Sequence, residues 1–394
     1  MRPEDFTADA PGQLVSTLEG HVAFAPDPLP PRLDLPPRTL GVLAEAAAAL
    51  GELKGIGRTL PNPHLLINPF KYREAVLSSR IEGTTADIED LVLFEATAEI
   101  GPNRPDDVRE VANYVAALEH GLSLLDHMPI CNRLVRDVHG RLLQRVRGQD
   151  RRPGEFRQAQ NAIAGYGMGV VEARFVPPPV HEMRQAMDAL ECYMGSRPLE
   201  PPFLVQLALI HYQFETIHPF MDGNGRMGRL LIPLLIQERG YLTQPLLYLS
   251  DYFDQHKEEY KDLLLAVSQR NQWSDWIEFF LRGVTDQSRD AVHRSDRLLD
   301  LWKRYRAEVQ APRTSTSLVR LVDLLFERPA VTIRVVSDTL EVTPKAAGDL
   351  VDRLVARGIL REMTGRTYKR VFLATGIVDI TMVPDAPVAS YQEA

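Results

Sequence analysis

Apolar positions with a helical period run through most of this chain and predict a mainly α-helical protein. One apolar run begins at Phe203, and we expect it to end at His218 because Pro219 pushes the preceding residue out of helical geometry. A second apolar run begins at Leu230 and predicts the next helix. Further helices are predicted over residues 39–53, 132–146 and 286–308, with another opening at Asp106 and Asp107.

The last part of the chain changes character. A predicted helix over residues 318–326 is followed by two more, which open at Thr332 and at Thr343-Pro344. Residues 361–373 then alternate like a hairpin with Gly365 at its turn. A helix, a helix-turn-helix and a wing make a winged-helix pattern. We expect five parts: a proline-rich arm with a helical segment, a core, a helical connector, a winged helix and a tail, over residues 1–105, 106–285, 286–312, 313–380 and 381–394.

Composition narrows the class of protein. The chain has 394 residues with 44% hydrophobic and 25% charged residues, as in ordinary globular proteins. Its net charge of −8 argues against wholesale nucleic-acid binding. The winged helix is mildly basic, however, and four of its residues are candidate DNA contacts: Lys345, Arg366, Lys369 and Arg370. A winged helix that binds protein instead is equally open. With two cysteines and no long apolar run, we expect a cytoplasmic protein without disulfides or membrane segments.

The stretch from His218 to Arg229 concentrates the candidate chemistry. Gly223-Asn224-Gly225 opens a predicted helix, so its backbone N–H groups can form an anion-binding nest. Arg226 and Arg229 lie three residues apart at this helix start, where cations are disfavoured unless an anionic ligand binds there. Asp222 is a candidate Mg²⁺ ligand, and His218 is a candidate base. These residues together predict phosphoryl-type chemistry on a polyanionic ligand.

Residues 218–229 also match, without departure, the motif His-Pro-Phe-x-Asp/Glu-Gly-Asn-Gly-Arg-x-x-Arg of the Fic-domain family. The resemblance implies a helical Fic bundle with a small β-hairpin flap, and transfer of AMP from ATP to a Ser, Thr or Tyr hydroxyl of a protein or of the enzyme itself. His218 would then deprotonate the hydroxyl, and Asp222 would hold Mg²⁺. The nest and Arg226 would hold the phosphates, and Arg229 would hold the γ-phosphate.

Ser78-x-x-x-Glu82-Gly83 resembles the inhibitory motif of Fic proteins. The resemblance implies that Glu82 pairs with Arg229 and so keeps the γ-phosphate from binding. In some relatives the same glutamate also helps water to remove AMP, so this reverse role stays open for Glu82. A homodimer is also open.

Two further sets of residues are candidates for ligand contacts. Arg174, Phe175 and Val176 resemble the flap that pairs with an extended piece of the target. Tyr252 and Asn271 are candidates for the adenine end of the nucleotide. A buried tyrosine that caps the helix bundle is about equally consistent with the sequence.

Two other functions remain as alternatives. His211, Glu215 and His218 fall on one helical face and match a fragment of a di-iron site, which favours a metal-dependent hydrolase. A convincing second ligand pair is missing from the sequence. The other alternative is a winged-helix transcriptional regulator in which the Fic-like core only senses nucleotide.

Overall fold

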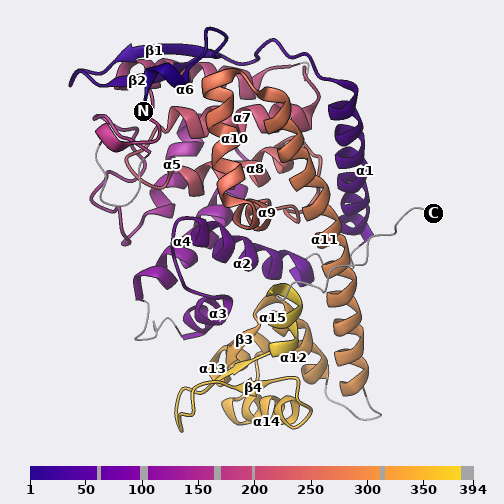
Figure 1. The fold of residues 1–394 in the computed structure, drawn as a ribbon. Coiled ribbons are helices and arrows are strands. Elements are labelled where there is room, and N and C mark those ends of the chain that lie inside the picture. Colours follow the sequence, from indigo (N-terminus) through magenta and orange to yellow (C-terminus); the bar gives the residue numbers. More distant parts are fainter. Residues whose placement is uncertain (60–63, 98–104, 164–169, 198–199, 311–315, 383–394) are drawn as a thin grey trace. The chain divides into compact units, whose positions relative to one another are not determined.

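The computed structural model describes residues 1–59, 64–97, 105–163, 170–197, 200–310 and 316–382 (Figure 1). Within these ranges helices dominate, and the strands form two small antiparallel sheets, which confirms the expected mainly α fold. The chain divides into two compact units. One comprises Met1–Leu60, Glu74–Thr85 and Arg109–Ala291, and the other comprises Pro61–Arg73, Ala86–Val108 and Val292–Ala394.

No helix among the described residues is both long enough and apolar enough to span a membrane.

Helix α7 (Phe203–Ile217) is the core of the first unit, and every one of its residues is buried. Helices α1, α6, α8 and α10 and strand β2 pack against it (Figure 1). The helices that lie wholly in this unit are α1 (Pro37–Thr59), α5 (Asn132–Leu142), α6 (Val180–Gly195), α8 (Asn224–Glu238), α9 (Ser250–Gln255) and α10 (Lys257–Arg270). The helices that contribute residues to both units are α2 (His64–Ile81), α4 (Pro105–Leu124) and α11 (Trp273–Val309).

The proline-rich arm contains a β-hairpin that the sequence pattern did not predict. Strands β1 (Gly12–Ser16) and β2 (Val22–Pro26) pair antiparallel, with Leu14 opposite Phe24. Ala23 and Phe24 are fully buried, and Ala23 clusters with Ala173 and Val176. The prolines that made this segment resemble an extended arm lie outside the two short strands, except for the last residue of β2.

The second unit contains the predicted winged helix. Its elements are α12 (Thr316–Glu327), β3 (Ala330–Thr332), α13 (Ile333–Leu340), α14 (Pro344–Val355), β4 (Arg361–Glu362), β5 (Val371–Leu373) and α15 (Thr375–Met382). The sheet has the order β3-β5-β4. Thr332 and Thr343 cap α13 and α14 by accepting from the N–H groups of Val335 and Ala346, as their positions before the apolar runs indicate.

Helix α3 (Ile88–Thr97) is an addition to this winged helix. It packs against β3, β5 and α15 in the same unit, although it lies more than 200 residues before them in the sequence. Ile88, Leu91 and Val92 are its buried residues. The sequence placed them only within an N-terminal helical segment, because a local apolar stripe does not name its packing partner. Of the expected tail, residues 383–394 lie outside the described part of the chain.

Candidate active site

The end of α7 places His218 at the start of a loop. His218 has left-handed backbone angles (φ 50°, ψ 59°), and its N–H donates to the carbonyl oxygen of Phe214 at 3.0 Å. Its Nδ1 lies 3.1 Å from the carbonyl oxygen of Glu215. Because a carbonyl oxygen can only accept, Nδ1 carries the proton and Nε2 keeps a free lone pair. Burial lowers the pKa of His218 to about 4, so its ring is a neutral base at physiological pH.

The loop after His218 is held by two asparagines. The Asn224 side chain accepts from the N–H of Phe220 and donates to the carbonyl oxygen of the same residue, both at 2.8 Å. Asn161 donates to the carbonyl oxygens of His218 and Phe220 at 3.1 and 2.9 Å. Phe220 is fully buried, as expected for a core residue that fixes the loop. The Asn224 side chain therefore fixes the loop, and its backbone is the part that faces a ligand.

Arg157 is a buried cation that holds the same loop through hydrogen bonds to its carbonyl oxygens. Its side chain donates to the carbonyl oxygens of His218, Ala159 and Pro178, and its N–H donates to the carbonyl oxygen of Pro219. Burial lowers the pKa of Arg157 to about 10, which still leaves it charged at neutral pH. The side chain thus connects the loop with the segment that precedes α6.

We expect Arg157→Ala to destabilise the protein. Deleting the guanidinium leaves buried carbonyl oxygens without a donor, which costs about 2–4 kcal/mol in total. Urea unfolding followed by circular dichroism should show a lower midpoint with an unchanged slope. Arg184→Ala, on the exposed face of α6, is the control. A midpoint for Arg157→Ala equal to that of this control would show that Arg157 does not hold the loop.

Glycine is required where the loop enters α8. Gly223 lies at φ 77°, and a Cβ there would stand 3.3 Å from Nε2 of His139. Gly223 has no side chain that could cap the helix, so the first N–H groups of α8 can bind an anion. The sequence predicted an anion-binding nest at residues 223–225, and the structure places these residues at the start of α8.

His139, on α5, also contacts the loop. It was not identified as a site residue from the sequence. Its Nδ1 accepts from the N–H of Gly154 at 3.0 Å, and its Nε2 donates to the carbonyl oxygen of Asp222 at 2.9 Å. Its ring stacks on Phe220 with 3.6 Å between centroids. Burial lowers the pKa of His139 to about 4, which keeps the ring neutral and both bonds intact. In the sequence it looked like one more residue on a helix face.

Asp222 fits a cation that is shared with phosphates. Its side chain is about one-third exposed, and Oδ1 accepts from the N–H of Gly223 at 2.6 Å. Mg²⁺ in nucleotide sites is held by one or two carboxylates together with phosphate oxygens and water. A single carboxylate beside an anion nest therefore fits Mg²⁺ with a nucleotide. The described ranges contain no group of three or more His, Cys, Asp or Glu side chains that could hold a metal by themselves.

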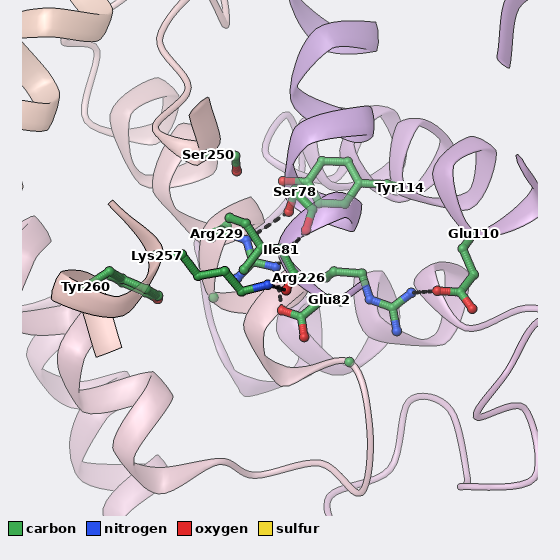
Figure 2. Close-up of polar contacts among 12 residues, drawn as sticks. Ser78, Ile81, Glu82, Glu110, Tyr114, Arg226, Arg229, Ser250, Lys257 and Tyr260 are labelled. Carbon is green, nitrogen blue, oxygen red and sulfur yellow. Dashed lines mark hydrogen bonds and ion pairs between the residues drawn. The ribbon is translucent and has the colours of Figure 1, made fainter. Parts of the chain in front are cut away.

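The two arginines of α8 point to different partners (Figure 2). Arg226 is almost fully buried, and its Nη1 donates to Oε2 of Glu110 on α4 at 2.8 Å. Arg229 turns toward the end of α2, where its Nε donates to Oγ of Ser78 at 2.9 Å and its Nη2 to the carbonyl oxygen of Ser78 at 3.0 Å. The spacing of three residues puts both arginines in the first turns of one helix, but their side chains diverge.

Glu82 completes the set of groups around Arg229. Its Oε1 accepts from Nη2 of Arg229 at 2.6 Å. Burial alone would raise the pKa of Glu82, but the Arg229 guanidinium outweighs it and holds that pKa below its usual value. The carboxylate follows directly after the C-terminus of α2, where negative charge is unfavourable. Arg229 and Lys257, whose Nζ donates to the carbonyl oxygen of Ile81 at 2.6 Å, offset that charge (Figure 2).

The Glu82 carboxylate lies directly over the nest. A Cβ at Gly225 would stand 2.4 Å from Oε1 of Glu82 and 3.0 Å from Nη1 of Arg229. The acidic oxygen therefore occupies space beside the backbone that an anionic ligand would approach. Because Gly225 has no Cβ, the Glu82 carboxylate and the Arg229 guanidinium can approach its backbone this closely.

A cavity of about 380 Å³ brings most of the predicted site residues together, and its volume suits a small-molecule ligand. It is lined by His218, Asp222, Gly223, Asn224, Gly225, Arg229 and Glu82. Arg226 and Ser78 lie behind this lining, bonded to Glu110 and Arg229. Gly83 follows at φ 99°, beyond the end of α2, where a residue with a side chain would be strained.

The two residues that the sequence offered for the adenine end lie outside the lining of this cavity. Tyr252 is buried with its ring against Phe279 and His256, with centroids 4.9 and 4.4 Å away, so it belongs to the helix packing. Asn271 is the exposed, left-handed cap of α10. Neither residue lines the cavity. The residues of α10 that do line it are Tyr260, Lys261, Leu264, Leu265 and Ser268. Their positions along α10 did not indicate this, because packing against α7 determines which face of α10 meets the cavity.

The predicted flap is a short bridged segment beside the cavity. Ile163 and Phe175 exchange backbone hydrogen bonds as an antiparallel bridge, and residues 164–169 lie outside the described ranges. Arg174 and Phe175 line the cavity, and Arg174 forms an ion pair with Asp262 of α10. Val176 is buried, and its carbonyl oxygen accepts from the N–H of Phe24 on β2 at 3.0 Å. The carbonyl oxygen of Val176 is therefore already hydrogen-bonded to strand β2.

His211 and Glu215 have different environments within α7. Nε2 of His211 lies 2.8 Å from the hydroxyl of Tyr260, and its Nδ1 lies 3.3 Å from the carbonyl oxygen of Gly228, so both ring nitrogens are used within the bundle. Burial lowers the pKa of His211 to about 3. Glu215 lines the cavity, and burial raises its pKa to about 7, although Arg229 opposes the shift. These surroundings favour a packed histidine over the metal-ligand alternative.

A neutral histidine, a glycine-lined helix start and an arginine paired with a carboxylate thus line one cavity of this helical bundle. Residues 40–123 match the family model described as Fic/DOC family N-terminal, and residues 129–236 match Fic/DOC family. Residues 318–378 match an HTH DNA binding domain. The chain is thus similar to the Fic/DOC family over residues 40–123 and 129–236, and to a helix-turn-helix domain toward its C-terminus.

Two relatives and two solved structures extend this comparison. Proteins named protein adenylyltransferase Fic from Drosophila ananassae and Aedes aegypti are 29% and 26% identical over 41% and 59% of this chain, which spans 31% and 42% of their lengths. A Fic family protein from Desulfovibrio desulfuricans G20 has a TM-score of 0.57 over 88% of this chain and 99% of its own, at 20% identity. A Fic domain containing signaling protein from Bacteroides thetaiotaomicron VPI-5482 reaches 0.51 over 65% of this chain and 97% of its own, at 19% identity. The structural likeness concerns the fold.

Proposed function

We propose that this chain is a protein adenylyltransferase that is held inactive by Glu82. The observation that carries the proposal is the position of the Glu82 carboxylate, which binds Arg229 and lies over Gly225 in a cavity that also contains His218. A carboxylate of the same chain occupies an anion site, and a triphosphate could take its place there. The neutral imidazole of His218 beside this site can act as the proton acceptor. The curated relatives that carry the name protein adenylyltransferase Fic support the same chemistry.

The reaction follows from the positions of these groups. Nε2 of His218 accepts the proton from a Ser, Thr or Tyr hydroxyl of the target, and the hydroxyl oxygen attacks the α-phosphorus of ATP. A new phosphorus–oxygen bond forms, the bond from the α-phosphorus to the oxygen that bridges to the β-phosphorus breaks, and pyrophosphate leaves. The N–H groups at the start of α8 stabilise the negative charge on the phosphates. Mg²⁺, held by Asp222, would neutralise phosphate charge when it binds.

Arg226 has a supporting role in this proposal. Its guanidinium is paired with Glu110 and lies 3.5 Å from Oδ1 of Asp222, so it orients the carboxylate that would hold Mg²⁺. Arg229 is the cation that lines the cavity and becomes available to the γ-phosphate when Glu82 withdraws. The adenine end of the nucleotide would lie toward the α10 residues that line the cavity, with Tyr260 and Leu264 among them.

Labelled ATP tests the reaction type. We expect the Glu82→Gly variant to incorporate label from α-labelled ATP into protein and none from γ-labelled ATP, because the γ-phosphate leaves within pyrophosphate. Phosphoamino-acid analysis and intact-mass spectrometry identify the product as one AMP on a hydroxyl. Label from γ-labelled ATP would mean phosphoryl transfer and would refute the proposal. Nucleotide binding without incorporation of either label would leave only the nucleotide-sensing alternative.

A second activity is favoured in the winged helix. Lys345 is exposed at the start of α14, the second helix of the helix-turn-helix, and Arg366 is exposed in the wing. Residues in these places contact DNA phosphates in winged-helix proteins. We propose that this domain binds duplex DNA.

Binding of the full chain to a labelled duplex should weaken steeply as salt rises, and Lys345→Ala should reduce the slope of log K against log salt by about 1. Lys303→Ala, an exposed lysine on α11, is the control and should leave the slope unchanged. Absence of binding at low salt would refute DNA binding and leave a protein-binding winged helix.

A further inference from the structure

An arginine-rich surface runs along α5 and the loop that follows it. This stretch contains two acidic residues, Asp137 and Asp150, although the whole chain carries a net charge of −8. Its arginines are all exposed: Arg133, Arg136, Arg141, Arg145, Arg147, Arg151 and Arg152. A basic segment of this density in an acidic protein creates a local positive potential, which attracts an anionic partner.

The protein's own carboxylates neutralise part of this surface. Arg147 lies 3.6 Å from Glu110, Arg151 lies 3.6 Å from Asp150, and Arg152 lies 3.6 Å from Glu155. The carboxylate of Asp137 lies 3.5 Å from Nε2 of His120, and its negative charge offsets part of the arginine charge. Among the described residues, Arg133, Arg136, Arg141 and Arg145 have no carboxylate within ion-pair distance. The positive charge that remains uncompensated is therefore concentrated at these four side chains.

Part of this surface is a shallow cavity of about 550 Å³. We call it the arginine groove. Three arginines and one acidic residue line it, together with small and uncharged residues: Arg133, Arg136, Arg141, Asp137, Gly140, Gln144, Pro153 and Gly154. Arg136 is fixed there, because its Nε donates to the carbonyl oxygen of Gly154 at 2.9 Å and its guanidinium lies 5.8 Å from the centroid of the Phe156 ring. Arg133 and Arg141 lie eight residues apart on α5, which is about 12 Å along the axis.

The arginine groove is next to the loop that carries the proposed chemistry. The opposite face of α5 presents His139, which donates to the carbonyl oxygen of Asp222. The backbone after α5 then reaches the same residue, since a Cβ at Gly148 would stand 2.8 Å from Oδ2 of Asp222. One helix diameter, about 10 Å, therefore separates the groove from the catalytic loop. A protein segment bound along the groove remains close to His218.

We propose that the arginine groove binds an acidic, extended segment of the protein that receives AMP. The identity of this partner as the acceptor rests on the proposed function. In an extended strand, side chains four residues apart lie on one face about 13 Å apart, close to the spacing of Arg133 and Arg141. A long nucleic acid would run beyond the groove and meet a surface whose overall charge is negative, whereas a short acidic segment would not.

Peptide binding to the full chain tests the groove without requiring any reaction. The probe is a short fluorescein-labelled peptide that alternates Glu and Ser, and its anisotropy is followed at low salt. We expect saturable binding that weakens with salt, and no binding of the same peptide with Gln in place of Glu. The variant Arg133→Ser/Arg141→Ser/Arg145→Ser should raise the Kd about tenfold, as three exposed ion pairs predict.

A variant with the same change of net charge provides the control. Arg32→Ser/Arg58→Ser/Arg184→Ser removes three exposed arginines elsewhere in the first unit and should leave the Kd unchanged. The groove proposal would be refuted if both triple variants weakened binding of the Glu peptide equally, or if the Gln peptide bound as tightly as the Glu peptide. A labelled single-stranded oligonucleotide that binds in the groove in place of the Glu peptide would overturn it as well.

The groove and the proposed function can fail independently. One outcome is peptide binding that depends on the three arginines while the Glu82→Gly variant transfers no AMP; it would support the groove and refute the transferase. The opposite outcome is transfer by Glu82→Gly without peptide binding; it would support the transferase and refute the groove. If both hold, the variant that lacks Arg133, Arg141 and Arg145 should lower kcat/KM for a protein acceptor with an acidic segment and leave ATP affinity unchanged.

Discussion

Replacing Glu82 with glycine is expected to raise the incorporation of AMP into protein by about 10²-fold, the effect of letting a triphosphate settle in line with its acceptor. In the structure, Oε1 of Glu82 accepts from Arg229 at 2.6 Å and leaves no room over Gly225. Without the carboxylate, Arg229 stays oriented by its two bonds to Ser78. The cation is then free and already in place for the γ-phosphate. Incorporation of α-labelled ATP by both proteins measures the effect.

Two further variants separate the effect of the Glu82 charge from the effect of introducing a glycine. Glu82→Gln keeps the size of the side chain and removes its charge, so we expect an increase smaller than that of Glu82→Gly. Glu52→Gly puts the same glycine into an exposed position of α1 and should leave transfer at the level of the unmodified chain. Equal transfer by Glu82→Gly and the unmodified chain, with ATP bound by both, would show that the carboxylate does not inhibit.

The local part of this site was readable from the sequence. Pro219 dictated that α7 ends at His218, and Gly223 at φ 77° is the turn into α8 that two closely spaced glycines predict. The pairing of Glu82 with Arg229 is present, but it was expected from a family resemblance and not from spacing. Residues close together in the chain can specify one another's geometry, and this loop is built from such residues.

The supporting groups were not predictable, because they arrive from distant segments. Arg157, Asn161 and His139 all bond to the loop, yet each looked like an ordinary surface or helix residue in the sequence. Arg226 was expected at the phosphates, and the structure pairs it with Glu110 across more than 100 residues of chain. Helical spacing predicts which residues share one face of a helix, but it does not predict which distant residues that face contacts.

The same limit explains which parts of the fold the sequence did not reveal. The buried residues of helix α3 pack against the winged-helix sheet formed by β3 and β5, more than 200 residues further along the chain. The β1–β2 hairpin was hidden among prolines, and its buried face is completed by Ala173 and Val176 from the predicted flap. In both cases the pattern identified an element or its apolar residues, while tertiary packing decided what those residues contact.

The second large effect is expected for His218→Ala, introduced into the Glu82→Gly background so that transfer is measurable. Loss of the general base should lower transfer by about 10³-fold. ATP affinity should change less than about twofold, because phosphate binding rests on the start of α8 and on Arg229. Isothermal titration with ATP and the label assay measure the two quantities. His181→Ala, an exposed histidine of α6, is the control. Transfer retained by His218→Ala would exclude the imidazole as the base.

The pH profile of the Glu82→Gly variant provides independent evidence for the same group. Burial lowers the pKa of His218 to about 4, and the negative charge of Glu82 opposes this shift, so removing Glu82 moves the pKa further down. The base is active when neutral, which means that kcat/KM falls only as pH drops through this low pKa. We therefore expect equal kcat/KM at about pH 5.5 and about pH 7.5, whereas an ordinary histidine would lose most of its activity at the lower value. An acidic limb centred near 6.5 would show that the base is a histidine in water, outside the cavity described here.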